Sequence, residues 1–171
     1  QQRVRAVEVL VELHGGVDEE TVRLLSVSAS AVVRARTAWA VGRQNPAAVN
    51  ADLLRPLLSD ADPLVRRLSL EALSGVTATA VWTALLPEIA AALDDENRLV
   101  RQSAALRMDR LDAKQLQQLE TLTLSSRRGQ MWFHVGRLQR RQELSAVGCR
   151  VAVEMLESPD SAPADRFDAV R

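Results

Sequence analysis

The sequence predicts an all-α protein built from stacked helical hairpins. Three observations support this prediction. A helix-forming unit recurs along the chain, successive copies lie 29 to 35 residues apart, and no stretch of useful length alternates between apolar and polar residues as a strand does. A period of this length is typical of helix pairs that stack on one another.

The clearest copy of the unit surrounds Arg66 and shows why the segment should be helical. Asp62 can accept hydrogen bonds from the free N–H groups of the first turn. Pro63 follows at the first helical position, where its missing N–H costs nothing. Gly75 is expected to end the helix in the left-handed conformation. An apolar stripe at helical spacing predicts the buried face, with both of its leucines fully buried, and consists of Val65, Leu68, Ala72 and Leu73.

The same positions recur around Arg34 and Arg101. A capping residue precedes each arginine by four positions, a small residue follows it by three, and a larger apolar residue follows it by seven. In that order the copies read Ser30, Thr37 and Val41, then Asp62, Ser69 and Leu73, then Asn97, Ala104 and Met108. A weaker copy begins at Val4 and Arg5, where Glu8 replaces the small residue.

The motif Asp-x-Asp-x-Leu-Val-Arg, followed by a small residue and Ala-Leu, resembles HEAT repeats, in particular the short-period repeats of phycobilisome-lyase-like HEAT proteins. The resemblance is good over 28–111, fair over 3–27 and poor after 124. It implies a right-handed α-α superhelix, a HEAT-like solenoid of about five hairpins, with the second helix of each hairpin on the concave face. We therefore expect 1–171 to form a single array, degenerate over 125–171, within a longer protein.

Each expected helix follows from its breakers and caps. Gly15 and Gly16 end the first helix, Asn45 and Pro46 break the chain, and Pro56 should bend or restart a helix. The expected helices cover 3–13, 18–25, 31–43, 47–58, 63–74, 79–93, 98–111, 113–123, 127–141 and 144–157, and a last one starts at 165. Trp39 and Trp82 are expected to fill space between repeats, with their N–H groups toward solvent.

Composition argues against several classes of function. The 22 basic residues balance the 22 acidic ones, so no global field attracts nucleic acid or acidic membranes. No apolar run is long enough for a membrane helix. The abundance of Arg, Ala, Val and Leu suggests a bacterial origin. The sequence does not indicate the compartment: the cytoplasm is the default, and a signal or other domains can lie outside this stretch.

The His and Cys residues, which often form catalytic or metal sites, have no suitable partners near them in the sequence. His14 and His134 have no ligand partners at metal-binding spacing, and the single Cys149 lies in an apolar stretch without a nearby base. The acidic trios 18–20 and 94–96 are better explained as helix caps than as acid–base pairs. We therefore predict a protein that is not an enzyme and needs no cofactor or metal.

The repeated arginines have a structural interpretation. A planar guanidinium at a fixed repeat position suits hydrogen bonding to an acidic residue or carbonyl of the neighbouring repeat. The predicted structural set is Arg34, Arg66 and Arg101, with Asp60 and Asp95 as acceptors and Ser28 in their place in the earlier copy.

The segment 127–141 is the most unusual part of the chain. It holds five arginines, and no acid occurs between Glu120 and Glu143. One interpretation is an amphipathic helix with Met131, Val135 and Leu138 inward. The other is a surface that binds phosphates and stacks bases. If 127–141 is a solenoid helix with a solvated outer face, Trp132 and Phe133 cannot both join the stripe, so one should pack into a neighbouring hairpin and the other should lie near the surface beside Arg137 or Arg140.

The leading hypothesis is a non-catalytic scaffold or spacer that binds a protein partner or links flanking domains. The alternative is a nucleic-acid-binding module that uses the Arg-rich helix 127–141. The candidate partner-binding residues are Arg36, Arg67, Arg107, Trp132, Arg137, Arg140 and Arg141. A salt-dependent gel shift separates the two hypotheses, because phosphate contacts weaken steeply with salt.

Overall fold

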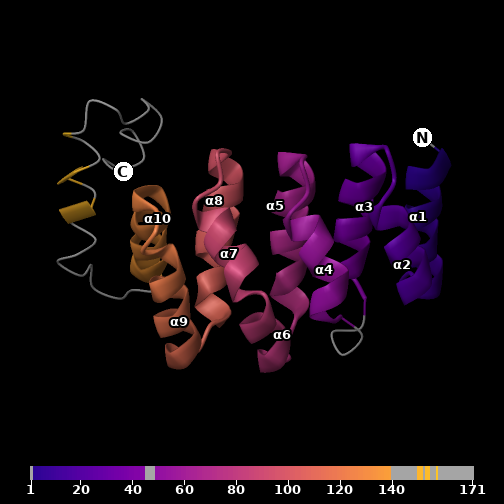
Figure 1. The fold of residues 1–171 in the computed structure, drawn as a ribbon. Helices are drawn as coiled ribbons and strands as arrows, with labels where there is room; N and C mark the ends of the chain where they lie inside the picture. The colour runs from indigo at the N-terminus through magenta and orange to yellow at the C-terminus, as the bar shows by residue number, and fades with distance from the viewer. Residues whose placement is uncertain (1, 45–48, 140–149, 152, 155–156, 158–171) are drawn as a thin grey trace. The chain divides into compact units, whose positions relative to one another are not determined.

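The computed structural model describes residues 2–44, 49–139, 150–151, 153–154 and 157 of the 171. In this part of the chain all regular structure is helical, with ten α-helices and no strand (Figure 1). The all-α class is therefore confirmed. The chain divides into two compact units, Gln1–Ile89 and Ala90–Arg171, with the boundary inside one helix.

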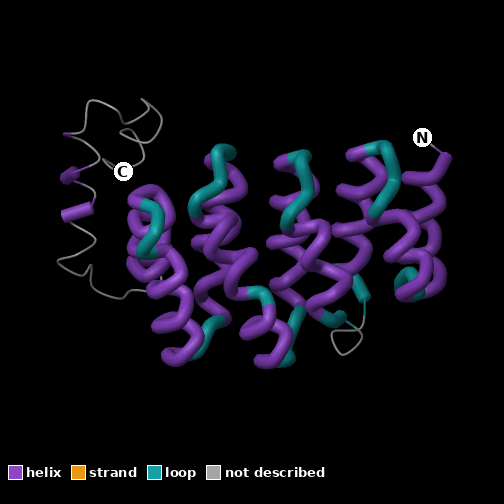
Figure 2. The backbone as a smooth tube through the Cα atoms, viewed as in Figure 1, coloured by secondary structure: helices purple, strands orange, loops and turns teal. Residues whose placement is uncertain are grey.

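The first unit contains most of the helices. They are α1 (Gln2–His14), α2 (Glu19–Ser26), α3 (Ala31–Val41), α4 (Ala51–Leu58), α5 (Pro63–Ala72), α6 (Thr79–Ala84) and the start of α7 (Leu86–Leu93). Helix α3 packs between α1 and α5, and α4 contacts both α2 and α6. Helices α1, α3 and α5 thus form one row, and α2, α4 and α6 form a second. Contacts of α3 with α2 and α4, and of α4 with α5, join the two rows. Short loops make most of the connections (Figure 2).

The second unit contains the end of α7 and three further helices. They are α8 (Arg98–Arg107), α9 (Ala113–Thr123) and α10 (Arg127–Gln139). A 3-10 turn, Met108–Arg110, continues α8, just as Leu73–Gly75 continues α5 in the first unit. Helix α10 packs against both α8 and α9, so it is covered on two faces.

Polar caps fix where the repeated helices begin. The Asp62 carboxylate accepts from the Leu64 N–H at 2.8 Å, and the Asn97 side chain accepts from the Leu99 N–H at 2.9 Å. Both caps were predicted, and both are confirmed. Ser30 also precedes its helix, but its side chain makes no capping hydrogen bond.

Two predicted helix boundaries are wrong. Helix α5 ends at Ala72 and tightens into a 3-10 turn, and Gly75 does not have the positive φ expected of it. The left-handed glycine is Gly15, at φ 73°, which ends α1 as predicted. The expected helix 79–93 is broken into α6 and α7 around Leu85, because Pro87 has no N–H to donate to a carbonyl in the preceding turn.

Two further predictions concern the helix that contains Pro56 and the helices expected at the end of the chain. Pro56 lies inside α4, which continues through it as one helix to Leu58. Most of the expected helix 144–157, and all of the one from 165, lie outside the described residues.

The apolar stripe largely forms the core, with one exception. Val65, Ala72 and Leu73 are buried, and Val41 and Met108, the equivalents of Leu73 in other copies, are completely buried. Leu68 was expected to be fully buried but is only partly so. It lies at the margin of the stripe, packed against a cluster of Ala35, Ala38, Leu57 and Val65. Among the described residues, no helix is long and apolar enough to cross a membrane.

Candidate functional site

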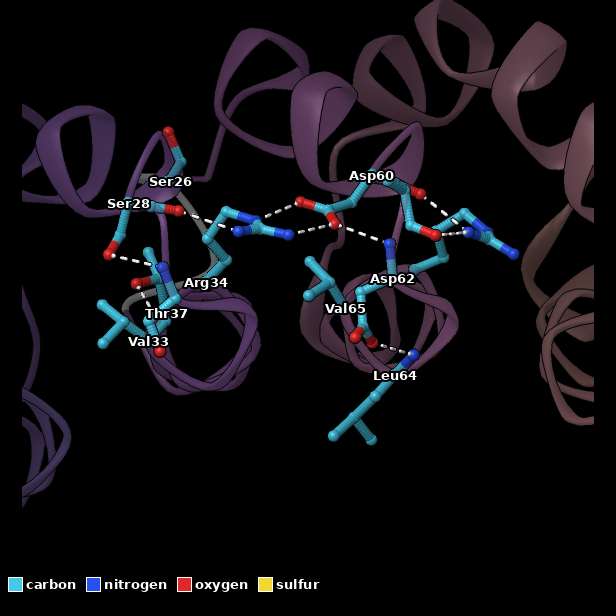
Figure 3. Close-up of polar contacts among 12 residues, drawn as sticks. Ser26, Ser28, Val33, Arg34, Thr37, Asp60, Asp62, Leu64 and Val65 are labelled. Carbon is cyan, nitrogen blue, oxygen red and sulfur yellow. Dashed lines mark hydrogen bonds and ion pairs between the residues drawn. The ribbon is translucent and has the colours of Figure 1, made fainter. Parts of the chain in front are cut away.

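Arg34 joins the loops that precede α3 and α5 in the first unit. Its Nε and Nη2 donate to the two carboxylate oxygens of Asp60, at 2.6 and 2.8 Å, in a planar fork (Figure 3). Its Nη1 donates to the main-chain carbonyl of Ser28 at 2.8 Å. Arg34 lies on α3 and Asp60 lies in the loop before α5, so this pair bridges neighbouring copies of the repeat.

The equivalent arginines bind the loop before their own helix. Arg66 Nη1 donates to the carbonyls of Asp60 and Ala61, at 2.7 and 2.9 Å. In the second unit, Arg101 Nη1 donates in the same way to the carbonyls of Asp95 and Glu96, again at 2.7 and 2.9 Å. All three arginines therefore bind the carbonyl six residues earlier, and the repeat position serves the fold.

The residue six positions before each arginine also forms a hydrogen bond through its side chain. Its side-chain oxygen accepts from the N–H of the capping residue two positions later. The pairs are Ser28 with Ser30 at 3.3 Å, Asp60 with Asp62 at 2.8 Å, and Asp95 with Asn97 at 2.8 Å. Serine thus replaces aspartate at this position in the first copy. Each such turn shapes the loop that enters the next helix.

The environment of Asp60 favours its charged form. Burial acts to raise the pKa of this carboxyl group. The hydrogen bonds from Arg34 and from the Asp62 N–H, together with the charges of Arg34 and Arg66, outweigh burial and hold the pKa below its usual value. The fork is therefore charged on both sides at neutral pH.

The start of helix α10 repeats part of the unit, namely the capping residue and the side chain that binds the carbonyl six residues earlier. Gln130 lies 29 residues after Arg101, and its Nε2 donates to the carbonyl of Leu124, six residues earlier, at 2.9 Å. Ser126, four residues before Gln130, accepts from the Gly129 N–H at 3.1 Å. The available signal was the capping serine at the repeat spacing. It was missed because glutamine replaces the arginine.

The predicted surface aromatic of α10 is wrong. Trp132 and Phe133 are both buried, with 6% and 1% of their surface exposed. Trp132 lies under Arg101, whose guanidinium carbon is 5.4 Å from the ring centroid. The predicted stripe is also wrong at Leu138, which is exposed. The reason is that α10 packs against two helices and so buries two faces where the amphipathic interpretation assumed one.

The candidate arginines of the first unit are engaged with acids. Arg36 pairs with Glu8 at 2.8 Å, across from α3 to α1. Arg67 pairs with Glu71 at 3.2 Å, one turn along α5.

The remaining candidate arginines belong to the second unit. Arg107 is half-buried, and Arg137 lines a small pocket with Phe133 and Glu120 between α9 and α10. Arg140 and Arg141 lie outside the described residues.

An arginine-flanked, partly exposed aromatic residue does occur, at Trp39 on α3. The guanidinium carbons of Arg36 and Arg43 each lie 4.8 Å from its ring centroid. Beside the ring is a pocket of about 210 Å³ between α3 and α5, which we call the Trp39 pocket. Its lining residues are Trp39, Gly42, Arg43, Leu68, Glu71, Ala72 and Ser74. The sequence signal was the placement of arginines three positions before and four positions after a tryptophan, on one helical face.

Other candidate residues are used internally. The Trp82 N–H donates to the carbonyl of Val76 at 3.0 Å in the interior, so the expectation that it faces solvent is wrong. His134 is buried, and its pKa is lowered chiefly by that burial, with a further lowering from Arg137 and an opposing effect of Glu120. The described residues contain no group of three His, Cys, Asp or Glu side chains placed to hold a metal ion.

Comparison with known proteins adds no relative. The chain matches no family model, no curated protein and no solved structure.

Proposed function

We propose that this chain is a non-catalytic interaction scaffold of HEAT-like repeats, a right-handed solenoid of about five hairpins that binds a protein partner or links domains. The observation that supports it is the recurrence of one hydrogen-bond set at three helix starts. In each copy the same position accepts from the cap, and the arginine six residues later binds the carbonyl of that position. The repeated set of hydrogen bonds gives the loop that enters each of these helices the same form, as an array of similar repeats requires.

Exposed apolar residues at a fixed repeat position support a binding role. Two residues before each arginine stands an exposed aliphatic side chain, namely Val32, Leu64 and Leu99. Such side chains add little to the core of their own helix. Each of them offers apolar contact area to a partner.

The nucleic-acid alternative has weaker support. Stacking of bases needs exposed aromatic rings, and both aromatic residues of α10 are buried. Arg36 and Arg67, which would contact phosphates, lie beside carboxylates that would repel them. A protein partner fits this mixed surface better.

Two binding assays on the same immobilised chain test the proposal. In the first, short random peptides displayed on phage are selected for binding. In the second, labelled single- and double-stranded oligonucleotides are titrated at several salt concentrations. We expect folded-state-dependent peptide binding and no oligonucleotide binding. Oligonucleotide binding that falls steeply with salt, with no peptide selected, would overturn the proposal in favour of the nucleic-acid module.

A further inference from the structure

The size of the Trp39 pocket indicates what kind of ligand it can hold. Sites for cofactors and drug-sized molecules usually enclose about 300–1,000 Å³. The Trp39 pocket, at about 210 Å³, is smaller and suits a single side chain. Its walls combine the ring of Trp39 and the partly buried Leu68 with the charged groups of Arg43 and Glu71.

The charges around the pocket leave one cation uncompensated. Glu8 neutralises Arg36 and Arg67 neutralises Glu71, at 2.8 and 3.2 Å. Arg43 is exposed, and among the described residues its guanidinium contacts the Trp39 ring and no carboxylate. The pocket therefore presents one positive charge beside an apolar wall.

The contact with Trp39 also prepares Arg43 to bind an acid. A guanidinium that stacks on an aromatic ring uses its face, while its N–H donors point outward in its plane. A carboxylate can accept two of these donors in the plane. Because the ring already restricts the arginine side chain, less conformational entropy is lost when the acid binds.

We infer that the Trp39 pocket captures an acidic peptide segment of a protein partner. An Asp or Glu side chain of that segment binds Arg43, and a neighbouring apolar side chain enters between Trp39 and Leu68. This inference rests on the proposed function and names the chemistry of the partner. A nucleic acid fits the pocket less well, because a run of phosphates needs several free cations and would meet Glu8 and Glu71.

The test begins with the peptides selected on the unmutated chain. We expect their sequences to be enriched in Asp or Glu next to a large apolar residue. The strongest binder is then synthesised, and its Kd is measured by fluorescence anisotropy for the unmutated chain and four variants. The variants are Arg43→Gln, Trp39→Ala, Glu71→Gln and, as a matched control in the second unit, Arg110→Gln, which also removes a largely exposed arginine.

The variants have distinct expected outcomes. Arg43→Gln should weaken binding roughly tenfold or more, as expected for loss of a charge-assisted hydrogen bond. Trp39→Ala should weaken it as well, and Arg110→Gln should leave it unchanged. Glu71→Gln should tighten binding, because it removes a like charge beside the bound carboxylate. This opposite sign is not expected from general damage to the fold, and matching circular dichroism melts provide the folding control.

Several results would overturn the inference. They are selected peptides without acidic enrichment, equal effects of Arg43→Gln and Arg110→Gln, or no selected peptide. If peptides bind but are insensitive to Arg43 and Trp39, the proposed function stands and only the place of binding is wrong. If oligonucleotides bind with an affinity that falls steeply as the salt concentration rises, and no peptide binds, the proposed function fails together with the inference.

Discussion

Trp39 and Trp132 have similar sequence neighbours and different environments. Each lies on a helix that carries several arginines. Trp39 is partly exposed, with Arg36 and Arg43 against its ring, and it borders a pocket. Trp132 is buried, and the guanidinium of Arg101, an arginine with only 1% of its surface exposed, lies over its ring. Basic residues near an aromatic therefore do not predict its exposure.

The difference arises from the helices that cover each tryptophan. Helix α3 packs between α1 and α5 but leaves the face of Trp39 open toward solvent. Helix α10 packs against α8 and α9, and Gly136 lets α8 come close, since a Cβ there would lie 3.0 Å from the main-chain carbonyl oxygen of Ala105. A helix enclosed on two sides buries residues that a single-stripe analysis assigns to the surface.

The largest expected effect is a difference in the free energy of unfolding between the alanine variants of the two tryptophans. Trp132→Ala should lower the free energy of unfolding by roughly 3–5 kcal/mol, because it leaves a cavity and uncovers Arg101. Trp39→Ala should lower it by about 1 kcal/mol or less, since its partly exposed ring contributes mainly cation–π contacts. Urea unfolding followed by circular dichroism measures both. Equal losses would show that the two environments do not differ as described.

A second pair of variants tests the stripe within a single helical segment. Leu73→Ala should cost about 2–5 kcal/mol, because Leu73 is completely buried at the repeat position. Leu64→Ala, on the exposed side of α5, should cost about 0.5 kcal/mol or less. Thermal melts of the two variants give the comparison. A melt of Leu73→Ala shifted by less than that of Leu64→Ala would mean that the buried face is misassigned.

The regular part of the fold could be predicted from the sequence because its signals are local. Asp62 and Asn97 sit directly before their helices, and a cap bonds only to the first turn. The apolar positions seven residues after each arginine follow from helical spacing alone. The 3-10 ends were missed because they depend on how the last turn tightens. The break at Leu85 comes from Pro87, whereas α4 continues through Pro56, so a proline alone does not show where a helix breaks.

The candidate site was harder to predict because it depends on contacts between helices. The pocket beside Trp39 exists because α3 and α5 approach closely at Gly42 and Ala72, which lie 30 residues apart in sequence. The burial of Trp132 likewise depends on α8. Spacing along one helix determines which residues share a face. It does not determine whether another helix covers that face.

The close approach beside Trp39 gives a third prediction. A Cβ on Gly42 would lie 2.7 Å from the main-chain Cα of Ala72, which cannot move independently of its helix. Gly42→Ala should therefore cost about 1–3 kcal/mol, although its φ of −68° suits alanine. Gly75→Ala is the matched control, because its Cβ would meet only ordinary contact, at 3.5 Å from the Gly42 carbonyl oxygen. If Gly42→Ala is neutral or stabilising by urea unfolding, the helices are not in such close contact.

The last comparison contrasts Arg34 with Arg101. Arg34 binds the titratable carboxylate of Asp60, whereas Arg101 donates to two main-chain carbonyls, which do not titrate. The pKa of Asp60 is lower in the folded chain than its usual value, so its contribution to stability is complete above that usual value of about 3.9. It is lost as the pH falls through the lower, folded pKa.

Asp60→Asn should therefore cost about 1–3 kcal/mol at neutral pH, because it removes a hydrogen-bonded charge from a largely buried fork. The difference between the variant and the unmutated chain should shrink below about pH 4, where the carboxylate of the unfolded chain begins to take up a proton, and should be lost as the pH falls through the lower pKa of the folded chain. Urea unfolding at a series of pH values measures this difference. Asp109→Asn, which neutralises an exposed aspartate, should cause little change in stability at neutral pH. A loss from Asp60→Asn that is the same at acid and neutral pH would mean that the fork with Arg34 does not depend on the charge of Asp60.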